Sequence, residues 1–144
     1  MKNILLILFI FSSFSYGHSA VKGDLMGTWR LVEYAVDKKY QDVPNPTPIK
    51  MYMNGEYIII FYLENKMNFN KGRYVIEDGQ VTETILSSST ESLEGEEISF
   101  KPNFMGDKNS FKINIDFGDY QTFERWEKTY CDLVECAKIR TRNN

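Results

Sequence analysis

Short strand-like segments, separated by turn signals at fairly even intervals, constrain the fold of this chain more than any other feature. Asn54-Gly55 and Asp78-Gly79 are dipeptides typical of two-residue β-hairpin turns, and Gly118-Asp119 marks a further reversal. The alternation of apolar and polar residues between such turns predicts eight strands. They cover residues 28–36, 49–53, 57–63, 73–77, 80–86, 97–101, 110–117 and 120–130.

Eight antiparallel strands joined mostly by hairpins can close into an up-and-down barrel, and this is the all-β fold that we expect. Aromatic residues make up 15% of the chain, which favours strands over helices. Pro44, Pro46 and Pro48 lie between the first two strands, where proline excludes a regular central strand. They predict a stiff loop at one mouth of the barrel, where it could act as a lid. Residues 132–140 are expected to form a short C-terminal tail or helix.

Residues 1–17 have the pattern of a secretory signal peptide. A basic residue precedes an apolar run over residues 4–11, and the small residues Ser15 and Gly17 precede the expected cleavage point. Cleavage after Ala20 is the alternative. The apolar run is short for a membrane span, and no cysteine stands at the cleavage point to carry a lipid anchor. We therefore expect a secreted or periplasmic protein.

The remaining residues, 18–144, suit one domain with one hydrophobic core. The formal net charge is −3, and such a mildly acidic domain lacks the basic surface that binds nucleic acids or anionic membranes. Cys131 and Cys136 could form a disulfide in an oxidising compartment and fasten the end of the chain. Free thiols are the alternative, and a metal site would need further ligands nearby.

Three short motifs that occur in order along the chain together resemble the lipocalins. They are Gly27-x-Trp29, then Gly72-x-Tyr74 with Glu83 on the next strand, then Glu124-x-Trp126 with Lys128 where the lipocalin pattern has arginine. The resemblance, to secreted bacterial lipocalin-like domains of the calycin type, covers nearly all of the mature chain. It implies an eight-stranded barrel with a binding role and does not imply a particular ligand.

The resemblance also implies a structural floor for the barrel. In calycin barrels the late arginine packs over the early tryptophan, which here is Trp29 beside Gly27. Lys128 lacks the planar guanidinium needed for that stacking. Arg125 is the candidate substitute, although it has the opposite strand parity.

Candidate ligand-binding residues follow from parity, because successive side chains of a strand point to opposite faces. The first strand offers two possible inward faces, one with Glu33 and the other with Tyr34, and a slip of one residue exchanges them. The full set of candidates is Glu33, Tyr34, Tyr62, Tyr74, Glu83, Glu124, Trp126 and Lys128.

Carboxylates in this set predict a polar end to the cavity. A lone buried carboxylate is costly unless it is paired or neutralised. Glu33, Glu83 and Glu124 should therefore meet Lys128, a tyrosine hydroxyl, trapped water or the ligand. We expect an aromatic cavity with a wet, polar floor that suits a small hydrophobic or amphipathic molecule. Internal ion pairing without a ligand is the alternative for the carboxylates, and ordinary packing is the alternative for the aromatic residues.

The sequence gives little support for catalysis. His18 is the single histidine and lies at the expected new N-terminus, so Ser-His-Asp, Cys-His and histidine-zinc arrangements lack their residues. Glycine-rich phosphate-binding motifs are absent from the sequence, and the acidic residues over 91–97 lack the spacing of a calcium loop. A Glu83 and Glu124 glycosidase pair is formally possible. We expect a protein that is not an enzyme and needs no cofactor or metal.

Two functions remain. The first is a secreted or periplasmic binding protein that holds a small, largely apolar ligand in the barrel. The alternative is an envelope protein-interaction module with a filled barrel and no small-molecule ligand. Its adhesive surface would come from residues 57–63 and 111–117, provided that their apolar side chains lie outside the barrel.

Overall fold

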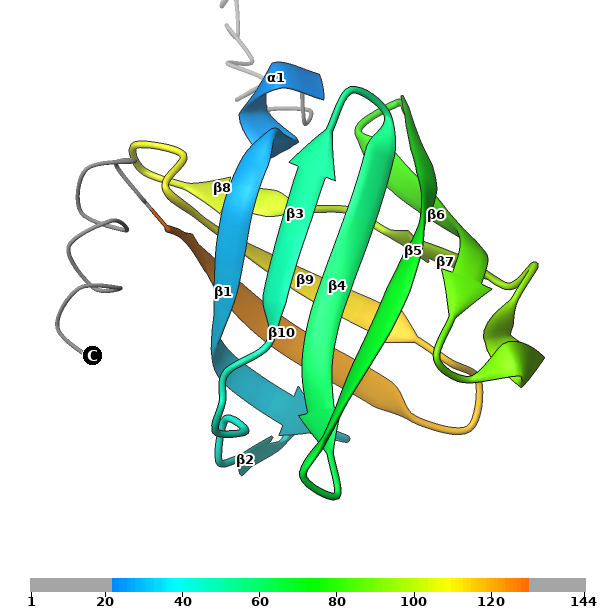
Figure 1. Ribbon diagram of the computed structural model, residues 1–144. Coiled ribbons are helices and arrows are strands. Elements are labelled where there is room, and N and C mark those ends of the chain that lie inside the picture. The colour runs from blue at the N-terminus through cyan, green and yellow to red at the C-terminus, as the bar shows by residue number, and fades with distance from the viewer. Residues whose placement is uncertain (1–21, 130–144) are drawn as a thin grey trace, which may run out of the picture.

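A computed structural model describes residues 22–129 of the chain (Figure 1). This part contains the short helix α1 (Lys22–Leu25), one 3-10 turn η1 (Glu91–Leu93) and ten strands. The strands are β1 (Gly27–Val36), β2 (Lys39–Gln41), β3 (Ile49–Met53), β4 (Glu56–Leu63), β5 (Lys66–Glu77), β6 (Gln80–Ser88), β7 (Glu97–Phe100), β8 (Asn103–Met105), β9 (Ser110–Asp116) and β10 (Gln121–Lys128). The expected signal peptide, the Cys131 and Cys136 pair and the expected tail lie outside the described residues.

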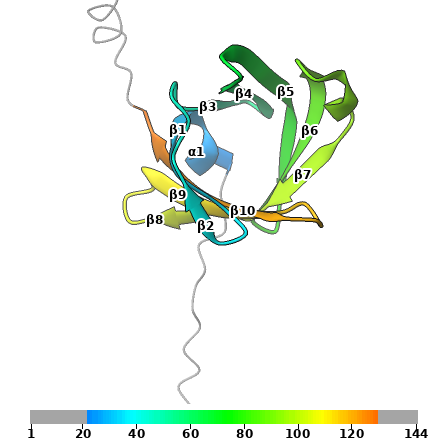
Figure 2. The ribbon, with the colours of Figure 1, turned by 90° about the horizontal axis from the view of Figure 1, so that it is seen from below.

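The ten strands form one antiparallel sheet in the order β7-β6-β5-β4-β3-β1-β10-β9-β8, with β2 paired to β1. Seen end-on, the sheet curls round on itself (Figure 2). Strands β7 and β8 end the sheet, and no ladder joins them within residues 22–129, although β7 lies against β9. The expected all-β antiparallel fold is confirmed, in the form of a barrel-like sheet whose ladder is not closed.

The count of eight strands was wrong because two short strands, β2 and β8, lie where loops were expected. Strand β2 folds back on β1 through Asp37 and Lys38, and both residues have positive φ, of 48° and 65°. That conformation suits a two-residue hairpin turn, but it is normally signalled by glycine or asparagine rather than lysine. The usual sequence signal for a hairpin was therefore missing.

The first and last strands of the described chain lie side by side, as the sequence predicts. Trp29 is the ladder partner of Lys128, and Leu31 is the partner of Trp126. A β-bulge then shifts the register between Leu31 and Glu33, so that Glu33 pairs with Arg125 and Tyr34 pairs with Glu124. The bulge shifts the alternation by one residue, so the positions of β1 that face inward differ before and after it. Trp29 and Leu31 therefore face inward before the bulge, and Tyr34 faces inward after it.

Aromatic side chains fill the end of the barrel nearest α1. Leu25, Trp29, Tyr52, Phe111 and Trp126 are at most 1% exposed. The Trp29 Nε1–H donates a hydrogen bond to the Leu25 carbonyl at 2.8 Å, and the Trp29 and Phe111 rings meet edge to face with centroids 4.6 Å apart. The short helix thus closes this end of the sheet by placing its last residue over the first tryptophan.

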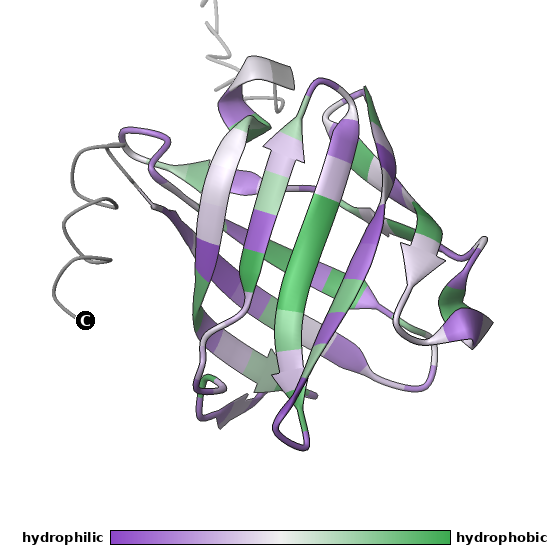
Figure 3. Ribbon diagram, in the orientation of Figure 1, coloured by the Kyte–Doolittle hydropathy of each residue, from purple (hydrophilic) through white to green (hydrophobic). Residues whose placement is uncertain are grey.

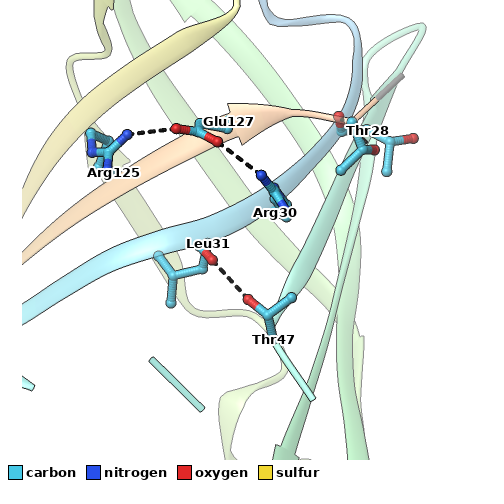
Figure 4. Close-up of polar contacts among 7 residues, drawn as sticks. Thr28, Arg30, Leu31, Thr47, Arg125 and Glu127 are labelled. Carbon is cyan, nitrogen blue, oxygen red and sulfur yellow. Dashed lines mark hydrogen bonds and ion pairs between the residues drawn. The ribbon is translucent and has the colours of Figure 1, made fainter. Parts of the chain in front are cut away.

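The proline-rich segment crosses from β2 to β3 at the opposite end (Figure 1). Its end is tied to β1, because the Leu31 amide donates to the Pro48 carbonyl at 3.0 Å and the Thr47 hydroxyl donates to the Leu31 carbonyl at 2.7 Å (Figure 4). Val43 packs against the core from this segment. The loop therefore lies at the end of the barrel away from α1, as expected for a loop at a mouth.

Candidate functional site

A buried ion pair joins β3 to β6 on the inward face of the sheet. The Lys50 Nζ is 3.2 Å from both carboxylate oxygens of Glu83, and the two residues are 5% and 2% exposed. The Tyr52 hydroxyl donates a further hydrogen bond to Glu83. Lys50 and Tyr52 are two positions apart on β3, so they share its inward face. Charges buried this deeply are tolerated because they are paired and hydrogen-bonded.

Aromatic rings surround the Lys50 ammonium. Its Nζ lies between 5.4 and 6.0 Å from the ring centres of Tyr52, Tyr57, Phe100 and Trp126. A ring face is electron-rich and attracts a cation at this range. The sequence-based reasoning missed Lys50 altogether. Its signal was present, since Lys50 alternates with the aromatic Tyr52 in a short apolar strand.

Glu124 of β10 is a second interior carboxylate. One of its oxygens accepts a hydrogen bond from Trp126 Nε1–H at 2.8 Å. Burial raises the pKa of Glu124; Lys50 and the Trp126 hydrogen bond oppose this effect, and Glu83 adds to it. Glu124 forms no salt bridge to any described residue. The interior thus holds two carboxylates near one lysine, and that lysine is paired with Glu83. We call Lys50, Glu83 and Glu124 the interior cluster.

Several hydroxyl groups around this cluster are buried without a partner. The hydroxyl oxygens of Tyr57, Tyr74 and Thr122 have no hydrogen-bond partner among the described residues. Burial raises the pKa of Tyr74, and the nearby Gly55 amide opposes that rise weakly. Burial and the Glu83 charge raise the pKa of Tyr57 well above its usual value. Burial and the Glu124 charge likewise raise the pKa of Tyr34, which is the ladder partner of Glu124.

The floor of the barrel contains Gly27, Trp29 and Lys128. The Lys128 Nζ lies 5.2 Å from the centre of the Trp29 ring, and a Cβ on Gly27 would approach Lys128 Cε to 2.7 Å. The assignment of Arg125 to the floor is corrected by its contacts. Its guanidinium pairs with Glu33 at 2.8 Å and with Glu127 at 2.7 Å, and Glu127 also pairs with Arg30 (Figure 4). Strand parity keeps Arg125 on the outer face, and Lys128 covers Trp29 instead.

Two further candidates lie on the outer face. Glu33 pairs with Arg125 because the bulge in β1 turns it away from the interior. Tyr62 was also expected inside, but β4 runs without a register shift from the buried Tyr57, so Tyr62 has the outward parity. Neither residue therefore joins the interior cluster. The structure brings together Tyr34, Tyr74, Glu83, Glu124 and Trp126 on the inward face of the sheet.

A groove of about 510 Å³ lies on the outer face across β3, β4, β5 and β6. Its apolar wall is formed by Met51, Met53, Ile58 and Leu86, and Glu56 and Lys71 add charges. The groove includes Lys71 and Gly72, the two residues between which β5 shifts its register against β6 at a bulge. The apolar run in β4 that borders it is visible in Figure 3. Half of that run thus faces outward, whereas Phe111, Ile113 and Ile115 of β9 are buried inside.

Comparison with known proteins identifies the fold alone. No family model matches the chain, and no curated protein matches it. An uncharacterised protein from Bacteroides eggerthii aligns with 73% of this chain and 99% of its own, at 18% identity and a TM-score of 0.51. A redesigned β-barrel aligns with 76% of this chain and 95% of its own, at 11% identity and a TM-score of 0.53. The chain is therefore similar in fold to a β-barrel.

Two features are absent from residues 22–129. None of the helices there has the length and apolarity that would be needed to cross a bilayer. Likewise, within this range no three His, Cys, Asp or Glu side chains gather in a way that could hold a metal ion.

Proposed function

We propose that this protein is a lipocalin-like binding protein, secreted or periplasmic and without catalytic activity, that holds a small, largely apolar molecule inside the barrel. The polar end of the ligand would lie against the interior cluster, and its apolar part would extend toward the end away from α1. In this proposal the ladder gap between β7 and β8 does not prevent the sheet from enclosing the ligand.

The observation that carries the proposal is the unpartnered Tyr57 hydroxyl beside the buried Lys50–Glu83 pair. A buried ion pair is often no more stabilising than apolar residues of the same volume, and an unpartnered buried hydroxyl lowers stability. Such a group is well suited to a ligand that completes its hydrogen bonding. Beyond Tyr57 on the inward face of β4, Ile59 and Phe61 are only half-buried, which leaves apolar surface for the rest of the ligand.

Neighbouring residues of β4 provide a matched test. Ile58 and Ile59 are both half-buried, but they have opposite parity, so a tryptophan at 59 enters the interior and a tryptophan at 58 enters the outer groove. The purified protein is titrated with a hydrophobic fluorescent probe, and the probe is then displaced with lipid extracts. We expect saturable binding that Ile59→Trp abolishes and Ile58→Trp preserves. The absence of saturable binding to the unmodified protein would refute the proposal.

A second candidate is the protein-interaction module, which the outer groove favours. Met53 and Leu86 are 61% and 54% exposed there, and an apolar groove of this size commonly marks a binding surface. In the same titration, this function predicts loss of probe binding in Ile58→Trp, since Ile58 lines the groove, and retention in Ile59→Trp. The two functions are thus separated by one pair of variants.

Export is tested separately. N-terminal sequencing of the protein recovered from outside the cytoplasm should begin at His18, or at Val21 if cleavage follows Ala20. Recovery from the cytoplasm with Met1 retained would contradict this part of the proposal.

A further inference from the structure

Charge is unevenly distributed inside the barrel. Lys50 is committed to Glu83 through two contacts of 3.2 Å, and Lys128 lies over the Trp29 ring. Neither of these inward lysines pairs with Glu124. One oxygen of Glu124 is held by the indole of Trp126, and the other has no hydrogen bond to a described residue. The interior therefore carries one carboxylate more than its ion pairing accounts for.

A second, independent feature lies on the same face of β10. Thr122 is 5% exposed, its hydroxyl has no partner, and it precedes Glu124 by two positions, so both side chains point inward. Across the interior, Tyr57 is 4% exposed and its hydroxyl is also without a partner. Hydroxyl oxygens can accept hydrogen bonds from a donor-rich group that Glu124 attracts.

Glu124 lies on the inward face of the sheet, but part of its side chain remains accessible. It lies close enough to Lys50 and Glu83 to feel both charges, yet its side chain is only half-buried. Its ladder partner Tyr34 is also half-buried and faces the same side. Glu124 is thus positioned to meet a molecule that enters from the end away from α1.

On these grounds we propose that the ligand is a small organic cation, an apolar molecule with a protonated amine that binds Glu124. This inference rests on the proposed interior binding function and names its ligand class. An anionic head such as a fatty-acid carboxylate would face Glu83, Glu124 and a lysine, Lys50, that is already paired. The other inward lysine, Lys128, lies over the Trp29 ring at the floor. The rings around Lys50 show that this interior accommodates an ammonium group against aromatic faces.

Three probes with the same eight-carbon chain separate charge from apolarity: octylammonium, octanol and octanoate. Each is titrated calorimetrically into the full protein and into Glu124→Gln. Glu127→Gln is the matched control, because it removes an outward carboxylate from the same strand. We expect octylammonium to bind about tenfold more tightly than either other probe, and Glu124→Gln to remove that preference while octanol binding persists. Glu127→Gln should leave it unchanged.

A pH series on the unmodified protein covers the case in which Glu124→Gln fails to fold. The groups facing Glu124 are Lys50, Glu83, Tyr34, Tyr52 and Trp126. Glu124 is a carboxyl group whose pKa is raised, so it becomes protonated at a higher pH than an ordinary carboxyl group does. Acidification should therefore weaken octylammonium binding at this higher pH. Octanol binding should not change. Equal affinity for all three probes, without such pH dependence, overturns the cation inference and leaves the binding function standing. If none of the probes binds, the proposed function and this inference fail together.

Discussion

The ammonium of Lys128 lies 5.2 Å above the ring of Trp29, and the two residues are ladder partners in the last and first strands. This contact joins the first and last strands of the described residues. A lysine performs the covering role because its aliphatic stem passes Gly27, where a Cβ would approach Lys128 Cε to 2.7 Å. Gly27 also has a φ of 131°, a conformation that residues other than glycine rarely adopt.

Lys128→Ala should destabilise the protein by about 1 kcal/mol, the usual size of a partly buried cation–π contact. Lys128→Arg should retain most of the stability, since guanidinium also stacks on an aromatic face. Chemical denaturation followed by tryptophan fluorescence measures both variants. Lys71→Ala, at an exposed position, is the control and should change stability by less than about 0.5 kcal/mol. Equal effects at positions 71 and 128 would count against the contact.

The Lys50–Glu83 pair should show strong coupling. Lys50→Met leaves a buried carboxylate without its cation and should cost about 3–5 kcal/mol. Adding Glu83→Leu should restore much of that loss, because the double variant removes both charges. The exposed Arg30–Glu127 pair is the comparison, and Arg30→Met there should cost at most about 1 kcal/mol. Additive losses in the Lys50 and Glu83 double variant would contradict the coupling.

Gly72 permits the close approach of β5 and β6 at their bulge. A Cβ at this position would lie 1.8 Å from the Thr84 carbonyl oxygen, which belongs to the backbone and cannot rotate away. Gly72→Ala should therefore destabilise the protein by about 2 kcal/mol or more. Gly23→Ala is the matched control, since no heavy atom lies within 4 Å of its added Cβ. Thermal unfolding should lower the Tm of the first variant and leave the second near that of the unmodified protein.

Alkaline pH should unfold this protein through its buried tyrosines. The pKa values of Tyr52 and Tyr57 are raised above 10.0 by burial and by Glu83, so both phenols stay protonated in the folded state. The unfolded chain loses these protons once the pH exceeds about 10, and it then binds fewer protons than the folded state. Stability should therefore fall as pH rises beyond that point.

Tyr57→Phe tests this directly. The variant should show a shallower loss of stability above pH of about 10, because one raised phenol pKa is gone. At neutral pH it should be as stable as the unmodified protein or more stable by up to about 1 kcal/mol, since an unpartnered buried hydroxyl is removed. Denaturant titrations at several pH values measure both effects. An unchanged alkaline slope would mean that Tyr57 does not contribute to it.

Local patterns in the sequence were sufficient for most strand positions and for the pairing of the two ends. Turns at Asn54-Gly55 and Asp78-Gly79 and the alternation between them depend on neighbouring residues, so they could be read without a structure. Parity then placed Glu83, Glu124 and Trp126 on inward faces. The same reasoning failed where the period of two is interrupted. The bulge beside Glu33 turned that residue outward. Tyr62 is a different case, because β4 keeps the period of two and gives Tyr62 the parity opposite to that of the buried Tyr57.

The sequence by itself determined a β-rich chain whose Trp29 segment pairs with its Trp126 segment, because turn residues and alternation act over a few positions. The tertiary structure alone decided that Lys50 meets Glu83, 33 residues away, within a ring of aromatic side chains. It also decided where the bulges fall and left Glu124 without a cation. These features depend on how the whole sheet curves, since curvature sets which distant side chains share the interior.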